Sequence, residues 1–310
     1  MTSPRRQIVD PDTPGYFQCV SRCVRRALLC GHDACSGQSF EHRREWVEDR
    51  LLELAEIFSV GVYAYAVMSN HLHVVLQADP LRPAQWSDEE LAERWVRLFP
   101  ARMNGHLDED ACAAKREGLL KDPARIAALR ERLGSVSWFT RFLNEPIARR
   151  ANFEDGCTGR FWEGRYKCQA LPDEAAIAAC IAYVDLNPIR AGMARDLTDS
   201  DHTSIKRRLD AMTEDTPDNV LLRPLAGLAP VDAFPITLGD YIDLVDWTGR
   251  QIRNDKRGHI ANAAPAALNM LGVNQRQWQT QVLGIESRYW RAVGAVDALE
   301  KKPRPSVSAG

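Results

Sequence analysis

The chain has 310 residues, of which 45% are hydrophobic, and its formal net charge is -2. This composition is that of a globular protein with room for one large domain or two modest ones. A charge so close to zero excludes a surface coated with cations for indiscriminate polyanion binding, so any nucleic-acid site must be a local basic patch.

No stretch approaches the roughly 20 uninterrupted apolar residues of a membrane span. The first six residues lead into Asp10 and Asp12 rather than into an apolar signal core. We therefore expect a cytoplasmic protein, which would lie on the nucleoid when it binds DNA.

The eight cysteines are expected to be reduced thiols that serve mostly as packing residues. The tightest group is Cys19, Cys23, Cys30 and Cys35, with His32 nearby. Its spacings do not match the paired short gaps of a zinc ribbon or finger, so a zinc site is disfavoured there.

The first half of the chain predicts a sheet with helices around it. Residues 16–24 alternate as a strand does, and residues 40–58 have the apolar spacing of an amphipathic helix. Strands at 60–67 and 71–77 follow, joined by a tight turn at 68–70, which indicates an antiparallel hairpin.

A charged helical segment then interrupts this pattern. We expect an inserted helical layer at about 80–135, with helices at 86–98 and 122–133 punctuated by prolines. Another helix follows at 136–151, and residues 152–164 lack any period and predict a loop.

The second half is predicted to be mostly helical. A helix at 173–186 should begin with Asp173 as its cap and end before Asn187-Pro188, since proline cannot continue it. We assign residues 1–199 to a first domain. The remaining segments are a linking region at 200–236, an accessory helical module at 237–300 and a disordered tail at 301–310.

The most informative residues are His71 and His73 in the predicted hairpin. Side chains two apart on a strand share a face at roughly 7 Å, so both imidazoles can reach one metal ion. A His-x-His pair alone is a weak signal, because it also arises by chance. A metal site needs at least a third ligand.

Tyr183 and Asn187 are four residues apart on the predicted helix and so share a face. Ala176 and Ala179 leave the surface beside the phenol shallow enough for an extended strand. The alternative is an amphipathic tyrosine with its hydroxyl in water, followed by a plain helix terminus.

Three spaced blocks together carry a more specific signal. They are Met68-Ser69-Asn70-His71-Leu72-His73, then Gly159 to Arg165 (GRFWEGR), then Tyr183 to Gly192 (YVDLNPIRAG). Over about residues 14–195 the chain resembles the REP-associated tyrosine transposases, which belong to the single-tyrosine HUH nucleases. The resemblance implies an α+β fold, with a ferredoxin-like or RRM-like antiparallel sheet, flanking helices, the helical insertion and a C-terminal helical extension.

The resemblance also implies the roles of the site residues. His71, His73 and Asn187 would bind one divalent cation, Mg²⁺ or Mn²⁺, and Tyr183 would be the nucleophile. The chain departs from related insertion-sequence enzymes, which have Gln where it has Asn187. Attack by the phenol would leave a phosphotyrosine on the 5′ side of the break and a free 3′ hydroxyl.

The expected partner is single-stranded or hairpin DNA, because the phosphate must reach a recessed site. The cations and aromatic ring that we assign to DNA binding are Arg22, Arg25, Arg26, Arg160, Trp162, Arg165, Lys167 and Arg190. Phe161 and Trp162 have an alternative role as core anchors.

Two other functions remain open on the sequence. A repurposed transposase would bind hairpin DNA without cutting it. A replication or conjugative HUH nuclease is disfavoured, because no helicase-like phosphate loop is visible. With Tyr183 as the single nucleophile, cleavage and rejoining must share that residue or use another subunit, so monomer and homodimer both stay open.

Overall fold

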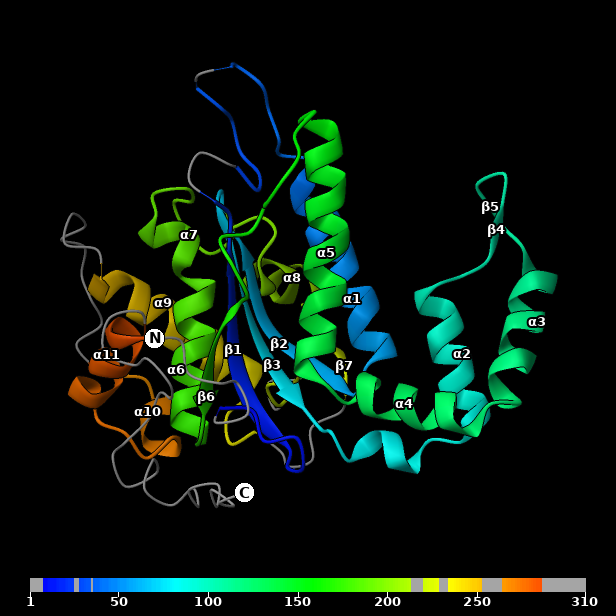
Figure 1. The fold of residues 1–310 in the computed structure, drawn as a ribbon. Helices are drawn as coiled ribbons and strands as arrows, with labels where there is room; N and C mark the ends of the chain where they lie inside the picture. Colours follow the sequence, from blue (N-terminus) through cyan, green and yellow to red (C-terminus); the bar gives the residue numbers. More distant parts are fainter. Residues whose placement is uncertain are drawn as a thin grey trace, which may run out of the picture.

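The computed structural model describes residues 8–24, 28–34, 36–212, 220–228, 234–252 and 264–285. They form an α+β fold, in which helices cover both faces of an antiparallel sheet (Figure 1). The predicted fold class is confirmed. No helix within these ranges is long and apolar enough to cross a membrane. The predicted tail at 301–310 lies outside the described residues.

The sheet has five strands in the order β6-β1-β3-β2-β7, and every neighbouring pair is antiparallel. The strands are β1 (Gly15–Arg22), β2 (Val60–Val67), β3 (His71–Ala78), β6 (Lys167–Leu171) and β7 (Ala226–Gly227). The predicted hairpin is confirmed as β2 and β3. All residues of β2 are buried, because the sheet is covered on both sides.

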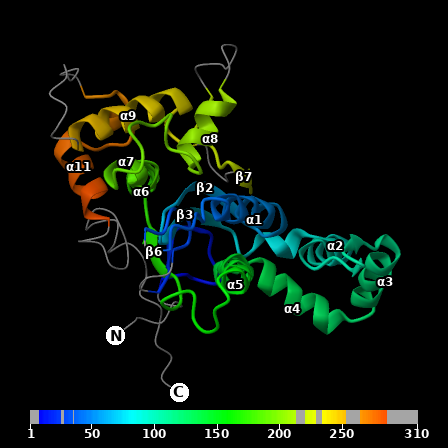
Figure 2. The ribbon, with the colours of Figure 1, turned by 90° about the horizontal axis from the view of Figure 1, so that it is seen from above.

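Four strands and two helices follow the βαββαβ order of a ferredoxin-like unit. Helix α1 (Arg43–Ile57) lies between β1 and β2, and α5 (Val136–Glu154) precedes β6. Both helices pack on the same face of the sheet (Figure 2). The spatial order β6-β1-β3-β2 brings the first and last strands of the unit side by side.

An arm projects from the body between β3 and α5 (Figure 1). Its elements are η2 (Arg82–Gln85), α2 (Asp88–Leu98), β4 (Arg102–Met103), β5 (His106–Leu107), α3 (Glu109–Leu120) and α4 (Pro123–Leu133). The helices predicted at 86–98 and 122–133 correspond to α2 and α4. Helix α3 and the small β4-β5 hairpin were not predicted.

The second face of the sheet is covered by elements from the later part of the chain (Figures 1 and 2). They are α6 (Glu174–Asp185), α7 (Asn187–Arg190), α8 (Ser204–Ala211), α9 (Leu238–Ile252), α10 (Ala267–Met270) and α11 (Gln275–Gly284). Residues 200–236, interpreted above as a linking region, contain α8 and β7. Thr203 caps α8 and bridges to Ala66 of β2, and β7 pairs with β2. This segment therefore packs on the sheet.

Helix α6 is enclosed on all sides. Asp173 caps it as predicted, with its carboxylate accepting from the Ala176 N–H at 2.7 Å. Every residue from Ala175 to Asp185 is buried, because the sheet lies on one side and the C-terminal helices lie on the other. The helix is apolar all round, which is typical of a helix in the interior of a protein.

Candidate active site at one end of the sheet

The two histidines lie side by side on β3. Their ring centroids are 4.7 Å apart, and the rings meet edge to face at 79°. His73 is completely buried and His71 is partly exposed. The two imidazoles therefore lie on the same face of β3, as predicted, and His71 is at the exposed end of the strand.

Side-chain amides hold the Nδ1 atom of each ring. His71 Nδ1 lies 2.6 Å from the Asn70 Oδ1, so this ring nitrogen donates its hydrogen to the amide oxygen. His73 Nδ1 lies 3.3 Å from the amide nitrogen of Gln18 on β1. The Gln18 Oε1 is buried without a hydrogen-bond partner, and turning the amide over would let this oxygen accept from Nδ1. In that arrangement Nε2 of each ring carries the lone pair that a metal would need.

Tyr183 of α6 packs directly against this pair. Its ring centroid lies 5.7 Å from that of His73, at an interplanar angle of 78°. Only 1% of Tyr183 is exposed. Its hydroxyl therefore does not lie in open water, and the surface beside its ring is not open as the sequence suggested. The ring lies against His73 of β3 and under Arg190 of α7, which accounts for the difference.

Two further residues predicted for the site, Arg190 and Asn187, come from α7. The Arg190 guanidinium carbon lies 4.7 Å from the centre of the Tyr183 ring, and this arginine is exposed. Asn187 begins α7 one turn beyond Tyr183 and is 8% exposed. Its amide Nδ2 is buried without a hydrogen-bond partner, which is costly for a polar group unless a ligand completes it.

Electrostatics keep His73 neutral. Burial lowers the pKa of His73 well below its ordinary value, and the nearby charges of His71, Arg22 and Arg190 lower it further. A neutral imidazole is the form that binds a metal.

The residues present fit a weakly held divalent cation. No group of three His, Cys, Asp or Glu side chains suited to a metal occurs within the described ranges. The candidate ligands are instead His71 and His73, with the amide oxygen of Asn187 as the third. The Asn187 Nδ2 that lacks a partner is a donor, which a phosphate oxygen and not a cation would complete. A ligand set of this kind brings no negative charge, so the full charge of a bound cation would face the substrate.

Basic residues gather at the same end of the sheet. Arg22 ends β1 directly opposite His71. The loop before β6 pairs with the β1 exit, since the Val24 N–H donates to the Phe161 carbonyl and the Glu163 N–H donates to the Arg22 carbonyl. The exposed cations of this loop and its edge are Arg160, Arg165 and Lys167. Arg25 and Arg26 lie outside the described residues.

The two aromatic residues of this loop, Phe161 and Trp162, anchor it to the core, which is the alternative role given for them above. Phe161 is 3% exposed and belongs to the core. Trp162 packs against that core edge to face with Phe161, and its indole N–H donates to the Asn144 carbonyl of α5 at 2.9 Å. Trp162 therefore fixes the loop to α5. Its ring is also partly exposed, and its role in DNA binding stays a prediction.

A second buried polar cluster lies on the other side of α6 and was not predicted. One oxygen of Asp185 accepts from the Ser204 hydroxyl and the Ile205 N–H, and the other accepts from the Tyr241 hydroxyl. Burial raises the pKa of Asp185 to about 6, although these hydrogen bonds and Arg208 act to lower it. The cluster ties the tyrosine helix to α8 and α9.

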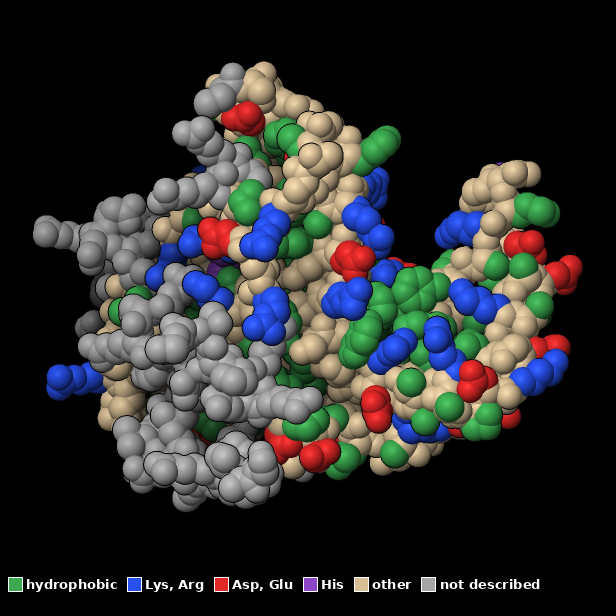
Figure 3. Space-filling model, in the orientation of Figure 1, with side chains coloured by type: hydrophobic (Ala, Val, Ile, Leu, Met, Phe, Trp, Pro, Cys, Tyr) green, Lys and Arg blue, Asp and Glu red, His purple; other side chains and the backbone are tan. Residues whose placement is uncertain are grey.

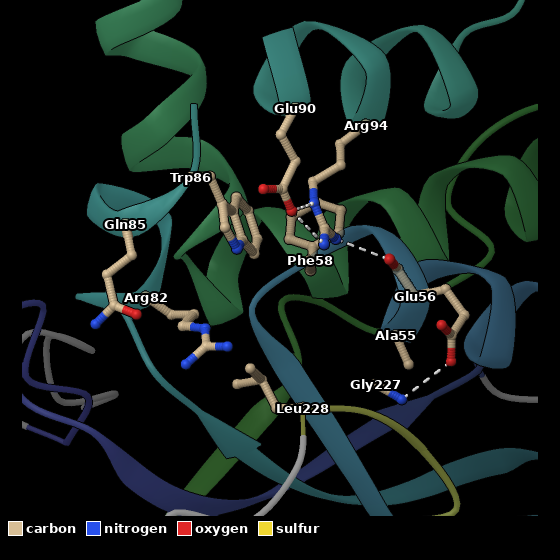
Figure 4. A pocket seen from close by; sticks show the side chains of 10 residues that line it. All are labelled: Ala55, Glu56, Phe58, Arg82, Gln85, Trp86, Glu90, Arg94, Gly227 and Leu228. Atoms are coloured by element: carbon tan, nitrogen blue, oxygen red, sulfur yellow. Dashed lines mark hydrogen bonds and ion pairs between the residues drawn. The ribbon is translucent and has the colours of Figure 1, made fainter. Parts of the chain in front are cut away.

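A separate cavity of about 390 Å³ lies far from these residues in the fold, at the base of the arm (Figure 4). Its polar walls largely satisfy one another. Arg94 donates to the carbonyls of Glu56 and Ile57, and the Gly227 N–H donates to the Glu56 carboxylate. The cavity contains none of the residues predicted for the site.

Comparisons with known proteins add one distant likeness. No protein-family model matches the chain, and no curated protein matches it. Among solved structures, the chain is similar to a REP-associated tyrosine transposase bound to a REP hairpin. The likeness covers 75% of this chain and 100% of that one, at 11% sequence identity and a TM-score of 0.34. At this level it carries no conclusion about function.

Proposed function

We propose that this chain is a metal-dependent endonuclease and strand transferase that acts on single-stranded DNA at hairpin-forming repeats. The observation that carries the proposal is the contact between the Tyr183 ring and the His71-His73 pair. A phenol and two imidazoles from distant parts of the sequence meet there, and one turn beyond Tyr183 the buried Nδ2 of Asn187 lacks a partner. The motif resemblance of the sequence supports the same function.

The reaction would be a transesterification. The Tyr183 oxygen would form a bond to the phosphorus, and the bond from phosphorus to the 3′ oxygen would break. The phenol would lose its proton to water, and the departing 3′ oxygen would take up one. The product is a 5′-phosphotyrosine beside a free 3′ hydroxyl, and its reversal at another 3′ end would rejoin the strands.

His71, His73 and Asn187 would hold the divalent cation, Mg²⁺ or Mn²⁺. When bound, this ion would stabilise the charge that builds on the non-bridging phosphate oxygens. Asn70 and Gln18 would orient the two imidazoles, which keeps the ligand geometry fixed before substrate arrives.

Arg190 would bind the scissile phosphate. Its guanidinium lies over the phenol ring and is exposed, so it stands between Tyr183 and solvent. Moving it onto a phosphate oxygen would open a way to the hydroxyl and place a positive charge at the reacting group. Arg22, Arg160, Arg165 and Lys167 would bind the phosphates on either side.

The decisive experiment is to trap the covalent adduct. Purified protein would be incubated with single-stranded hairpin DNA and Mg²⁺ or Mn²⁺, and the adduct separated on a denaturing gel. We expect Tyr183→Phe to abolish it. The matched control is Tyr63→Phe, a buried tyrosine of β2 that packs on Tyr16 and should leave the adduct unchanged. An adduct that survives in Tyr183→Phe would refute the assignment.

A second candidate is specific binding of hairpin DNA without cleavage. The 1% exposure of Tyr183 favours it, because a nucleophile has to reach its phosphate. Retained hairpin binding with no adduct under any divalent cation would support this candidate over the first.

A further inference from the structure

The strongest unassigned feature is a hollow between the arm and the body (Figure 3). Hydrophobic side chains line its wall, and Lys and Arg side chains surround them. We call it the aromatic groove. Its residues are Trp95 and Phe99 at the end of α2, Trp138 and Phe142 on α5, and the cations Lys115, Arg132 and Arg141.

Four aromatic rings form one continuous surface across the junction. Trp138 and Phe142 are stacked at 5.6 Å, and Phe142 meets Phe99 at 5.3 Å and Trp95 at 5.9 Å. The surface is not closed over, because Phe99 is 39% exposed and Trp138 is partly exposed. Packing of the arm on the body explains why Trp95 and Phe142 are buried, but it does not explain why Phe99 and Trp138 stay partly exposed.

The cations of the groove lie near ring faces, and Lys115 also donates to the Phe99 carbonyl. Arg132 lies 4.7 Å from the centre of the Trp138 ring and 5.9 Å from that of Trp95. No carboxylate among the described residues pairs with its guanidinium. Arg141 also lies over Trp138, at 5.1 Å, and Lys115 lies 5.9 Å from the Phe99 ring. Arg141 does have an acidic partner, Glu145.

Aromatic faces interleaved with cations fit single-stranded nucleic acid, whose bases stack on rings and whose phosphates pair with arginine. The groove and the basic loop at the site both contact helix α5. Trp138 lies on α5 six residues before Asn144, whose carbonyl anchors Trp162 of that loop. Six residues of helix rise about 9 Å, so a short length of strand would span the distance along α5.

We propose that the aromatic groove binds a second stretch of single-stranded DNA, the flank that continues from the hairpin past the cleavage site. This inference rests on the proposed function for its substrate. It adds a role for the arm, which is to hold the flank by stacking and by the charge of Arg132, while Tyr183 and the histidines act on the scissile phosphate.

The test compares a hairpin that carries a single-stranded flank of about 15 nucleotides with the same hairpin lacking it. Fluorescence anisotropy without divalent cation measures both affinities, so that no cutting occurs. We expect the flank to tighten binding to the unaltered protein by about fivefold to a hundredfold, the range for stacking of one base. Trp138→Leu and Arg132→Gln should each lose most of this gain and bind the flankless hairpin normally.

The matched control is Trp46→Leu. Trp46 of α1 also lies under an arginine, Arg150 at 3.6 Å, but it stands outside the groove. Circular dichroism checks that each variant folds, and Arg132→Gln keeps all four rings in place. Equal affinity for the two hairpins, or a flank gain that survives both groove variants, would overturn the proposal.

The outcome is separable from that of the adduct assay. If the flank tightens binding through Trp138 but no adduct forms, the groove stands and the catalytic proposal falls. If an adduct forms but the flank adds nothing, the groove alone is refuted. Concentration-dependent dimerisation lost in Trp138→Leu, with no effect of the flank, would assign the groove to a second copy of the chain and also refute the proposal.

Discussion

Two polar clusters on opposite sides of helix α6 differ in how completely the protein satisfies them. Tyr183 and Asp185 are two residues apart, about 200° around the helix, so one faces the histidines and the other faces α8 and α9. Both oxygens of Asp185 are matched by donors from the protein. At the other cluster, the buried Nδ2 of Asn187 lacks a partner, and Gln18 Oε1 gains one from His73 only when its amide is turned over.

The difference separates a structural cluster from a candidate site. Burying a polar group without a hydrogen bond costs about 1–3 kcal/mol, so a fold retains such groups where something else uses them. The Asp185 carboxylate is explained by the protein alone, although the Nε of the nearby Arg208 also lacks a partner. At the histidine cluster, a phosphate oxygen of the proposed substrate would complete the Asn187 Nδ2.

The largest effect should come from breaking the histidine cluster. We expect His73→Gln to slow adduct formation by about a thousandfold or more, about 4 kcal/mol in the barrier, because the buried ligand of the cation is lost. Single-turnover kinetics at saturating Mn²⁺ measures this rate. His106→Gln, an exposed change at the tip of the arm, is the control. A rate within tenfold of the unaltered protein would show that His73 is only a packing residue.

The Asp185 cluster should instead control stability. Asp185→Ala leaves the buried Arg208 without its nearby carboxylate, and we expect the free energy of unfolding to fall by about 3–5 kcal/mol. Urea denaturation at pH 7 measures the change. Ser137 of α5 shares a partly buried hydrogen bond with the Tyr166 hydroxyl, and Ser137→Ala should cost much less. A loss of less than about 1 kcal/mol would contradict a structural role.

The same carboxyl should give stability a distinctive pH dependence. Its pKa is about 6 in the folded protein and 3.8 in the unfolded chain, so the folded state binds the proton more tightly. This group therefore adds stability at low pH, and its contribution is lost as the pH rises from about 4 through about 6. The difference in unfolding free energy between the protein and Asp185→Asn, measured across this range, should change by up to about 3 kcal/mol. A constant difference would contradict the raised pKa.

The parts of the fold that were predictable are those with strong local patterns. The apolar run around His71 and His73 marked the hairpin, and Asp173 marked the start of α6. Helix α8 was missed because only Ile205 and Leu209 give its eight residues an apolar pattern, and docking on β2 supplies the rest. The burial of Tyr183 was missed because His73, on which its ring packs, lies on a strand far away in the sequence.

The same difference between local patterns and tertiary contacts is found within the candidate site. His71, His73 and Tyr183 were predicted together from motifs, and the fold brings them into contact. Gln18 was missed because its partner His73 is on another strand. Trp162 was assigned to DNA, and only tertiary structure shows its indole bonded to α5.

The smallest effect is expected at Gln18, which would orient the predicted ligand His73 without being a ligand itself. Gln18→Leu removes the amide beside His73 Nδ1, and we expect the Mn²⁺ concentration for half-maximal adduct formation to rise by about tenfold to a hundredfold. Gln18→Glu retains an acceptor for the ring N–H and should largely restore the affinity for the cation. The maximal rate at saturating Mn²⁺ should change little in either variant, because neither removes a ligand or the nucleophile. Equal loss of cation affinity in both variants would mean that the shape of Gln18, and not its hydrogen bond, orients His73.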